Sequence, residues 1–183
     1  MDLFIGQGYA ATTLEQVATR AEVAVQTVYF HFGNKRTVLS AAIDVLVVGD
    51  DDPMAMIDRP QARAALAATD PAQAIGTWVG NAQTIFERVA PLLGILRDAV
   101  GADPDLAQEW QINRKQRLAD HRTFATHLAT IGALAPGMST TRATDIIYAL
   151  LAPEMYALLT SERAWSPGEW SAWATAMLTR ALL

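Results

Sequence analysis

Residues 13–35 read TLEQVATRAEVAVQTVYFHFGNK, and this stretch decides the fold. Thr13 and Gln16 have the spacing of a capping box, after which apolar residues recur at helical intervals. A gap at residues 22–25 leads to a second apolar segment, which Gly33 ends. The stretch therefore predicts two short helices joined by a tight turn.

Helical signals continue on both sides of this stretch. Asn34 can cap a helix over residues 35–48, and residues 49–60, with an acidic run before a proline, predict a linker. Beyond the linker, helices are predicted over residues 61–68 with 71–90, 91–101, 104–131, 139–162 and 167–182. No alternating strand pattern of useful length is present in the sequence.

The composition supports a folded helical protein with two parts. Of the chain, 51% is hydrophobic and only 18% is charged, which argues against disorder. We expect an all-α fold, with an N-terminal helix-turn-helix head of three helices at residues 1–48 and a helical C-terminal domain at residues 49–183. The sequence has no cysteine, no signal-type start and no long apolar run, so we expect a cytoplasmic protein that does not enter a membrane.

The predicted pair of short helices has the shape that enters a DNA major groove, with its second helix lying along the bases. The amide of Gln26 can pair with adenine, and Val25 can contact a thymine methyl group. Five side chains carry donors suited to phosphate oxygens: Thr13, Thr27, Tyr29, His31 and Lys35. For Tyr29 and His31, packing inside the head is the alternative. Six apolar side chains are expected to be buried in the head: Leu14, Val17, Ala18, Val23, Val28 and Phe32.

Several short motifs of the head occur in a fixed order. Leu-Phe, Gly-Tyr, Thr-Thr and Val-Ala-x-x-Ala precede Thr27-x-Tyr29-x-His31-Phe32-x-x-Lys35, which is the most specific part. With these motifs in register, residues 3–42 resemble the DNA-binding domain of the TetR family of transcriptional regulators. The resemblance implies an all-α homodimer with a ligand-binding C-terminal domain. It also implies that the five donor side chains contact the DNA backbone, with Val25 and Gln26 near bases.

Three features depart from the usual pattern of this family. Glu22 stands where the turn usually has glycine, and Ala24 stands where a serine or threonine usually caps the second helix. The chain also begins inside the expected first helix. Residues 1–50 contain three basic and five acidic residues, a net charge of −2, which is poor for binding phosphates. We therefore expect that N-terminal residues are missing from the head.

One face of the helix predicted over residues 104–131 combines apolar and polar side chains at spacings of three and four. These are Trp110, Asn113, Arg117, His121 and Phe124. Such a face suits a pocket for a ligand with a polar or anionic end. The alternative, more common for any one of these residues, is a partly solvated face with the arginine lying over the core. Three more residues complete the predicted ligand site. Trp78 and Phe86 form an aromatic stripe on the segment 71–90, which suits either a core or a pocket, and Tyr148 lies in the segment 139–162.

The last two predicted helices are apolar on more than one side. Pro153 lies within the segment 139–162 and predicts a kink there. Helices that are apolar on two sides need two partners, so we expect the body core on one side and a second subunit on the other. The alternative is a pair of helices that is simply well buried within one chain.

The sequence therefore predicts a homodimeric regulator that binds double-stranded DNA, most simply a repressor that a small-molecule effector releases from a palindromic operator. A helical dimerisation or ligand-binding protein with a degenerate DNA-binding head is the alternative, which the acidic head favours. An enzyme ranks last, because the sequence has no nucleophile elbow, phosphate loop or paired acid–base constellation. No metal or other cofactor is predicted, because the three histidines, His31, His121 and His127, are scattered.

Overall fold

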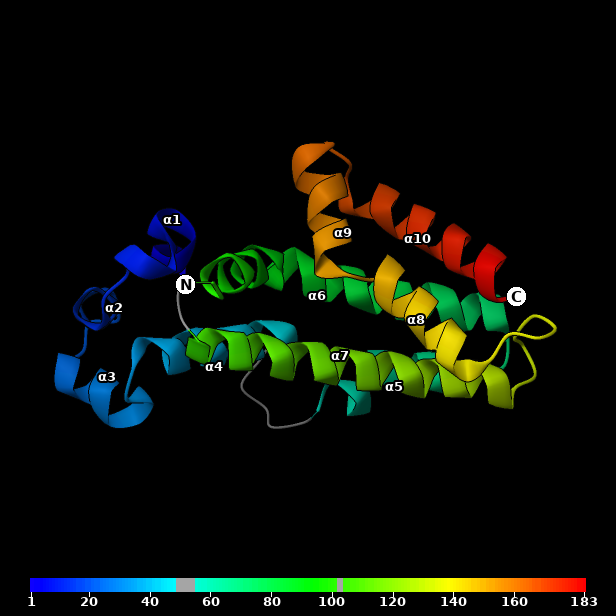
Figure 1. The fold of residues 1–183 in the computed structure, drawn as a ribbon, viewed down its shortest axis with the longest axis horizontal. Helices are drawn as coiled ribbons and strands as arrows, with labels where there is room; N and C mark the ends of the chain where they lie inside the picture. Colours follow the sequence, from blue (N-terminus) through cyan, green and yellow to red (C-terminus); the bar gives the residue numbers. More distant parts are fainter. Residues whose placement is uncertain (49–54, 102–103) are drawn as a thin grey trace.

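The computed structural model describes residues 1–48, 55–101 and 104–183, and the regular elements in these ranges are all helices (Figure 1). In chain order they are α1 (Asp2–Ala11), α2 (Leu14–Arg20), α3 (Val25–Phe32), α4 (Lys35–Val48), the 3₁₀-helix η1 (Met56–Asp58), α5 (Pro60–Ala67), α6 (Pro71–Ala99), α7 (Pro104–Thr130), α8 (Thr140–Leu150), α9 (Pro153–Ala157), the π-helix η2 (Leu158–Glu162) and α10 (Pro167–Leu182). The predicted all-α fold is confirmed. The start of the predicted linker, residues 49–54, lies outside the described ranges.

The head, α1 to α4, has a small core of its own where α2 and α3 meet. Four of the predicted core residues contribute to it: Leu14, Ala18 and Val28 are buried and Val17 is partly buried. The prediction is wrong for Val23, which is 44% exposed because it lies in the turn between the two helices. It is also wrong for Phe32, which is 37% exposed at the last position of α3.

The elements after the head, η1 to α10, form the body. The head is attached to the body through α1 and α4, which both pack against α6. Phe4 of α1, with Leu39 and Ile43 of α4, is buried in the same core as the side chains of the body. Near the end of α4, the backbone carbonyl of Val47 accepts a hydrogen bond from Nη2 of Arg88 on α6, at 3.3 Å. The two anchoring helices therefore tie the head to α6.

The long helix α6 runs through the middle of the body and contacts α1, α4, α5, α7, α9 and α10 (Figure 1). The prediction of two segments, 71–90 and 91–101, is wrong, because α6 continues through Pro91 to Ala99. Pro91 itself is exposed, while Val89 and Leu92 on either side of it are buried. A proline inside a helix costs about 3 kcal/mol, and burial of the flanking apolar side chains offsets this cost.

A complete break separates α8 from α9, where a kink within one helix was predicted. The residue before Pro153, Ala152, is extended at φ −76° and ψ 134°, and Pro153 is the first residue of α9. Proline disfavours the helical conformation in the residue before it and suits the first position of a new helix. The segment 139–162 is therefore three elements, of which α9 rises away from the long helices of the body (Figure 1).

Local capping sets where the other body helices begin. The side chain of Asp70 accepts a hydrogen bond from the Ala72 backbone N–H at 3.1 Å, and Pro71 opens α6. Ser166 and Glu169 form a reciprocal capping box before Pro167 opens α10. These helix starts agree with the prediction, because a cap depends on only a few consecutive residues.

Replacing Glu22 with glycine should raise the free energy of unfolding by about 1 kcal/mol. Glu22 has φ 56°, a left-handed conformation that costs a residue with a Cβ atom about 1 kcal/mol relative to glycine. This is the turn position at which the resembled family usually has glycine. Urea unfolding followed by circular dichroism measures the change. Glu22→Gln, which removes the charge and keeps Cβ, should change stability by less than ~0.5 kcal/mol. An equal gain in both variants would assign the effect to charge instead of backbone strain.

Candidate nucleic-acid interface

Most of the surface of α3 faces solvent, because Val28 is its single buried residue. Gln26, Thr27 and His31 are exposed, Tyr29 is 48% exposed and Phe30 is 85% exposed. Phe30 is the most exposed of the large apolar side chains that the structure describes. Because most side chains of α3 are exposed to solvent, this helix is available to a partner outside this chain.

A shallow hollow of about 340 Å³ lies beside α3, where the end of α1 meets the beginnings of α2 and α4. Its lining residues are Ala10, Thr12, Thr13, Leu14, Glu15, Tyr29, Gly33, Asn34 and Lys35. The N-cap residue of α2, Thr13, and the capping residue of α4, Asn34, both line it. Helix N-termini carry partial positive charge and free backbone N–H groups, which suit a phosphate.

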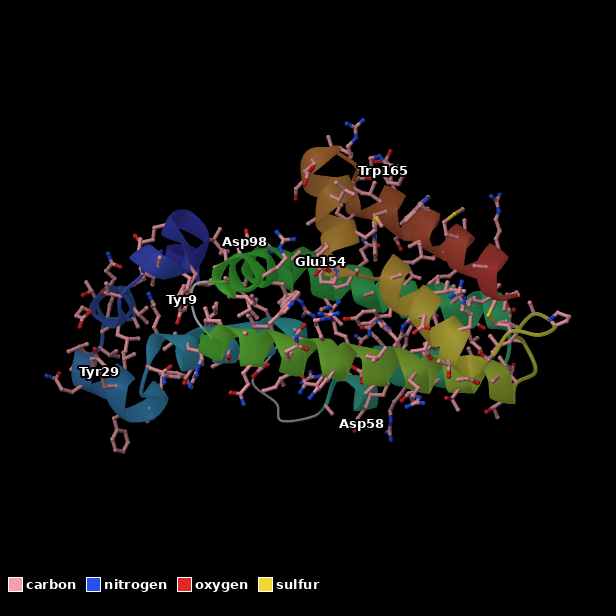
Figure 2. The ribbon with its side chains drawn as sticks, viewed as in Figure 1. Tyr9, Tyr29, Asp58, Asp98, Glu154 and Trp165 are labelled. Carbon is pink, nitrogen blue, oxygen red and sulfur yellow. The ribbon has the colours of Figure 1, made fainter. Side chains whose placement is uncertain are left out.

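Three of the predicted phosphate contacts, Thr13, Tyr29 and Lys35, meet at this hollow. Figure 2 shows Tyr29 in the head, far from the body helices. The predicted capping box of Thr13 and Gln16 is present, with the Gln16 N–H donating to Thr13 Oγ1 at 3.3 Å. Residues from α2, α3 and α4 therefore converge, although they are separated in the sequence.

Lys35 has partners inside the head that the sequence reasoning missed. Its ammonium group donates to the carbonyl oxygens of Tyr9 at 2.6 Å and Ala10 at 3.3 Å, and it lies 4.3 Å from the centre of the Tyr9 ring. A cation at the C-terminus of α1 is stabilised by the helix dipole. Lys35 therefore joins α4 to α1 and places a positive charge in the hollow, while its contact with phosphate stays a prediction.

Glu15 is an acidic residue of the hollow that was not predicted as part of the site. Hydrogen bonds lower the pKa of its carboxyl, first from its own backbone N–H and then from the hydroxyls of Thr13 and Tyr29. Glu15 is therefore ionised at neutral pH and stabilises the start of α2. A second acidic residue, Asp2, forms an exposed ion pair with Arg20 at 3.0 Å. Both carboxylates reduce the positive potential that the head offers to DNA.

The two predicted base contacts differ in their setting. Gln26 is exposed on the second position of α3, whereas Val25 is half-buried and packs against the small head core. Val25 is covered on one side because the first turn of α3 lies close to α2, and its contact with a base stays a prediction. Phe30 lies four residues after Gln26, which places both side chains on one face of α3. The ring of His31 packs edge-on against Phe30, with 5.2 Å between ring centroids.

Most of the predicted ligand-site residues lie together within the body. Seven of them form a connected set of ring contacts and hydrogen bonds: Trp78, Trp110, Asn113, Arg117, His121, Phe124 and Tyr148. Phe86 lies apart from this set and packs against Tyr156 and Trp170. Arg114 and Glu154 also act on the set electrostatically, and of these two Arg114 was missed by the sequence reasoning.

Within residues 1–48, 55–101 and 104–183, no group of three or more His, Cys, Asp or Glu side chains is arranged to hold a metal ion. No helix there has the length and apolar character needed to cross a membrane.

The head matches a family model described as bacterial regulatory proteins, tetR family, over residues 1–42. Solved structures match nearly the whole chain. PfmR from Thermus thermophilus, a TetR-family transcriptional regulator, has 18% identity and a TM-score of 0.66, covering 99% of this chain and 94% of its own. NalD from Pseudomonas aeruginosa, the secondary repressor of a multidrug efflux pump, has 21% identity and a TM-score of 0.70, covering 100% and 91%.

FadR from Bacillus subtilis, a transcriptional regulator solved with stearoyl-CoA, has 16% identity to this chain and a TM-score of 0.72, covering 97% of this chain and 92% of its own. Among curated protein sequences, none matches this chain. The resemblance seen in the head motifs is confirmed by the family model, and the fold of the whole chain is confirmed by the solved structures.

Proposed function

We propose that this chain is a DNA-binding transcriptional regulator, and specifically a homodimeric repressor that a small molecule releases from a palindromic operator. The proposal is supported by the match of its head to the tetR-family model and by the fold that it shares with solved regulators. The observation that carries the proposal is the exposed face of α3 beside a hollow formed by the beginnings of α2 and α4. Gln26 and Phe30 would lie against base edges, and the hollow would hold a backbone phosphate.

The proposed dimer is supported by α10. Its inner face, with Trp170, Ala174 and Leu178, is fully buried within the chain. Its outer face has small exposed residues, Ala172 and Ala176, which permit close approach of a second helix. A two-fold dimer through α8 and α10 would present two copies of α3, and a spacing of about 34–36 Å would match successive major grooves.

Repression and release by a ligand are proposed from the polar cluster of the body and from the solved relatives. NalD is a repressor, and FadR was solved with an acyl-CoA ligand. The dimer would have conformations that differ in the distance between the two heads. A ligand would act by binding one of these conformations more tightly than another. The second candidate function, a ligand-binding dimer with a degenerate head, is favoured by one observation: acidic Glu15 lines the hollow that would hold a phosphate.

DNA selection from a random library, followed by fluorescence anisotropy titrations at several salt concentrations, tests the proposal. We expect an inverted repeat to be selected and its affinity to fall steeply as salt rises. Gln26→Ala should reduce the preference at one base pair by about 10–100-fold, because a bidentate amide contact discriminates by roughly 1–3 kcal/mol. Tyr29→Ala should weaken binding to all sequences alike.

Gln73→Ala is the matched control for these titrations, because Gln73 is an exposed glutamine in the first turn of α6, in the body. It should leave both affinity and sequence preference unchanged. Equal binding of the unaltered protein to every sequence, with no inverted repeat selected, would contradict the repressor proposal and support the degenerate head. Unchanged preference in Gln26→Ala alone would contradict the base contact.

A further inference from the structure

A group of polar side chains lies where α6, α7 and α8 meet, with His121 and Trp78 buried and Asn113, Arg117 and Tyr148 half-buried. Asn113, Arg117 and His121 are spaced by four residues along α7 and so share one face of that helix. Trp78 reaches this face from α6, and Tyr148 reaches it from α8. Such a concentration of hydrogen-bonding groups in an otherwise apolar interior is costly unless each group has a partner.

Arg117 is the charged member of the group and is incompletely paired. Its Nε donates to Asn113 Oδ1 at 3.1 Å, whereas its Nη1 is buried without a hydrogen-bond partner. The guanidinium carbon lies 5.2 Å from the ring centre of Tyr148 and 5.9 Å from that of Trp110. Burial lowers the pKa of Arg117, which records the cost of holding this charge away from water. An anion at Nη1 would remove that cost.

His121 supplies a neutral donor one turn along the same face. Its Nδ1 accepts a hydrogen bond from Trp78 Nε1 at 3.3 Å, so the proton of the neutral ring is on Nε2. Burial, and then the charge of Arg117, lowers the pKa of His121 to about 3, so the ring is uncharged at neutral pH. The ring also packs edge-on against Tyr148 at 6.1 Å. His121 therefore offers an N–H group without adding a second charge.

Tyr148 supplies a third donor. Its hydroxyl oxygen accepts a hydrogen bond from Arg114 Nε at 3.2 Å, which leaves its own hydrogen free to donate elsewhere. The carboxylate that acts electrostatically on Arg117 is that of Glu154, at the start of α9 (Figure 2). Glu154 acts on Arg117 through space only, because no carboxylate in the described ranges forms an ion pair with Arg117. The group therefore presents one positive charge, with an Nη1 that has no acceptor, and two further donors from His121 and Tyr148.

Aromatic side chains line the apolar side of the group. The rings of Trp78 and Phe124 are stacked in parallel, with their centroids 4.6 Å apart. The ring of Trp110 also lies beside the guanidinium. We propose that this group is the effector site and that the effector is an apolar carboxylate, whose anionic end binds Arg117, His121 and Tyr148. The assignment as effector site rests on the proposed function, whereas the ligand class follows from the donors alone.

Isothermal titration calorimetry on the full chain, without DNA, tests the ligand class. The probes are 1-naphthoate and dodecanoate, each compared with its uncharged amide, and 1-naphthyl phosphate. We expect at least one carboxylate to bind more than about 10-fold tighter than its amide, because a charge-assisted hydrogen bond in a buried site is strong. Equal affinity for acid and amide, tighter binding of the phosphate, or no binding of any probe would overturn the proposal.

Arg117→Gln should abolish the preference for the carboxylate, and Arg117→Met should do the same if the glutamine variant folds poorly. Both variants should melt at or above the temperature of the unaltered protein, because an unpaired buried charge has been removed. Arg122→Gln is the matched control, since Arg122 is an exposed arginine of the same helix that lies outside this group, and it should keep the full preference. Retention of the full preference by both Arg117 variants would also overturn the proposal. A protein that binds carboxylates and no DNA would contradict the proposed function alone.

Discussion

Replacing Ala176 with arginine should convert the protein from a dimer to a monomer and weaken operator binding by about 100-fold or more. Ala176 is exposed on α10, on the side away from buried Ala174 and Leu178, so the fold of one chain has room for the new side chain. In a two-fold interface the same patch faces itself, so two arginines would be brought together and desolvated. Sedimentation velocity measures the mass, and anisotropy titration measures operator affinity.

Ala129→Arg is the matched control for this experiment. Ala129 is an exposed alanine near the end of α7, outside the proposed α8 and α10 interface. The control should remain dimeric with unchanged affinity for the operator. A dimer of undiminished stability in Ala176→Arg would place the subunit contact elsewhere on the chain.

Replacing Phe124 with alanine should lower the free energy of unfolding by about 3–5 kcal/mol, as is usual for a buried phenyl ring. Phe124 is completely buried in α7, and its ring stacks on Trp78 of α6. The deletion therefore leaves a cavity at the contact of the two long helices and frees the indole that hydrogen-bonds His121. Urea unfolding at a fixed protein concentration, followed by circular dichroism, measures the loss.

Phe30→Ala provides the comparison for this loss, because it removes the same ring from a side chain that is 85% exposed. Its effect on stability should be within about 0.5 kcal/mol. The explanation by burial would fail if the two variants lost similar amounts, or if Phe124→Ala lost less than about 1 kcal/mol.

Helix starts could be predicted from the sequence wherever a cap lies next to the helix that it begins. The start of α2 follows from Thr13, which accepts the expected hydrogen bond. The helices predicted from residues 71 and 167 begin at those residues, where the side chains of Asp70 and Ser166 cap them. The two internal prolines show the limit of such local reasoning. The helix α6 continues through Pro91, because Val89 and Leu92 on either side of it are buried. Pro153 is instead the first residue of a new helix, α9. Which outcome applies depends on the packing of distant segments.

The same limit applies to the two sites. Spacings of three and four residues were enough to place Asn113, Arg117 and His121 on one face of α7. The roles of Arg114 and Glu154 depend on where α8 and α9 cross that face, which the sequence does not contain. In the head, Val23 and Phe32 were placed inside because they are apolar. Val23 instead lies exposed in the turn between α2 and α3, and Phe32 is exposed at the last position of α3.

The unbroken course of α6 links the polar group of the body to the head. Trp78 contacts His121 towards one end of this helix, while Asp98 lies near the other end, beside the head (Figure 2). A helix of 29 residues is about 43 Å long, so a tilt of about 5° about one end would move the other end by about 4 Å. In a symmetric pair, both copies of the helix would tilt together. A displacement of a few ångströms beside Trp78 would then be enough to move two DNA-reading helices out of step with the turns of a double helix.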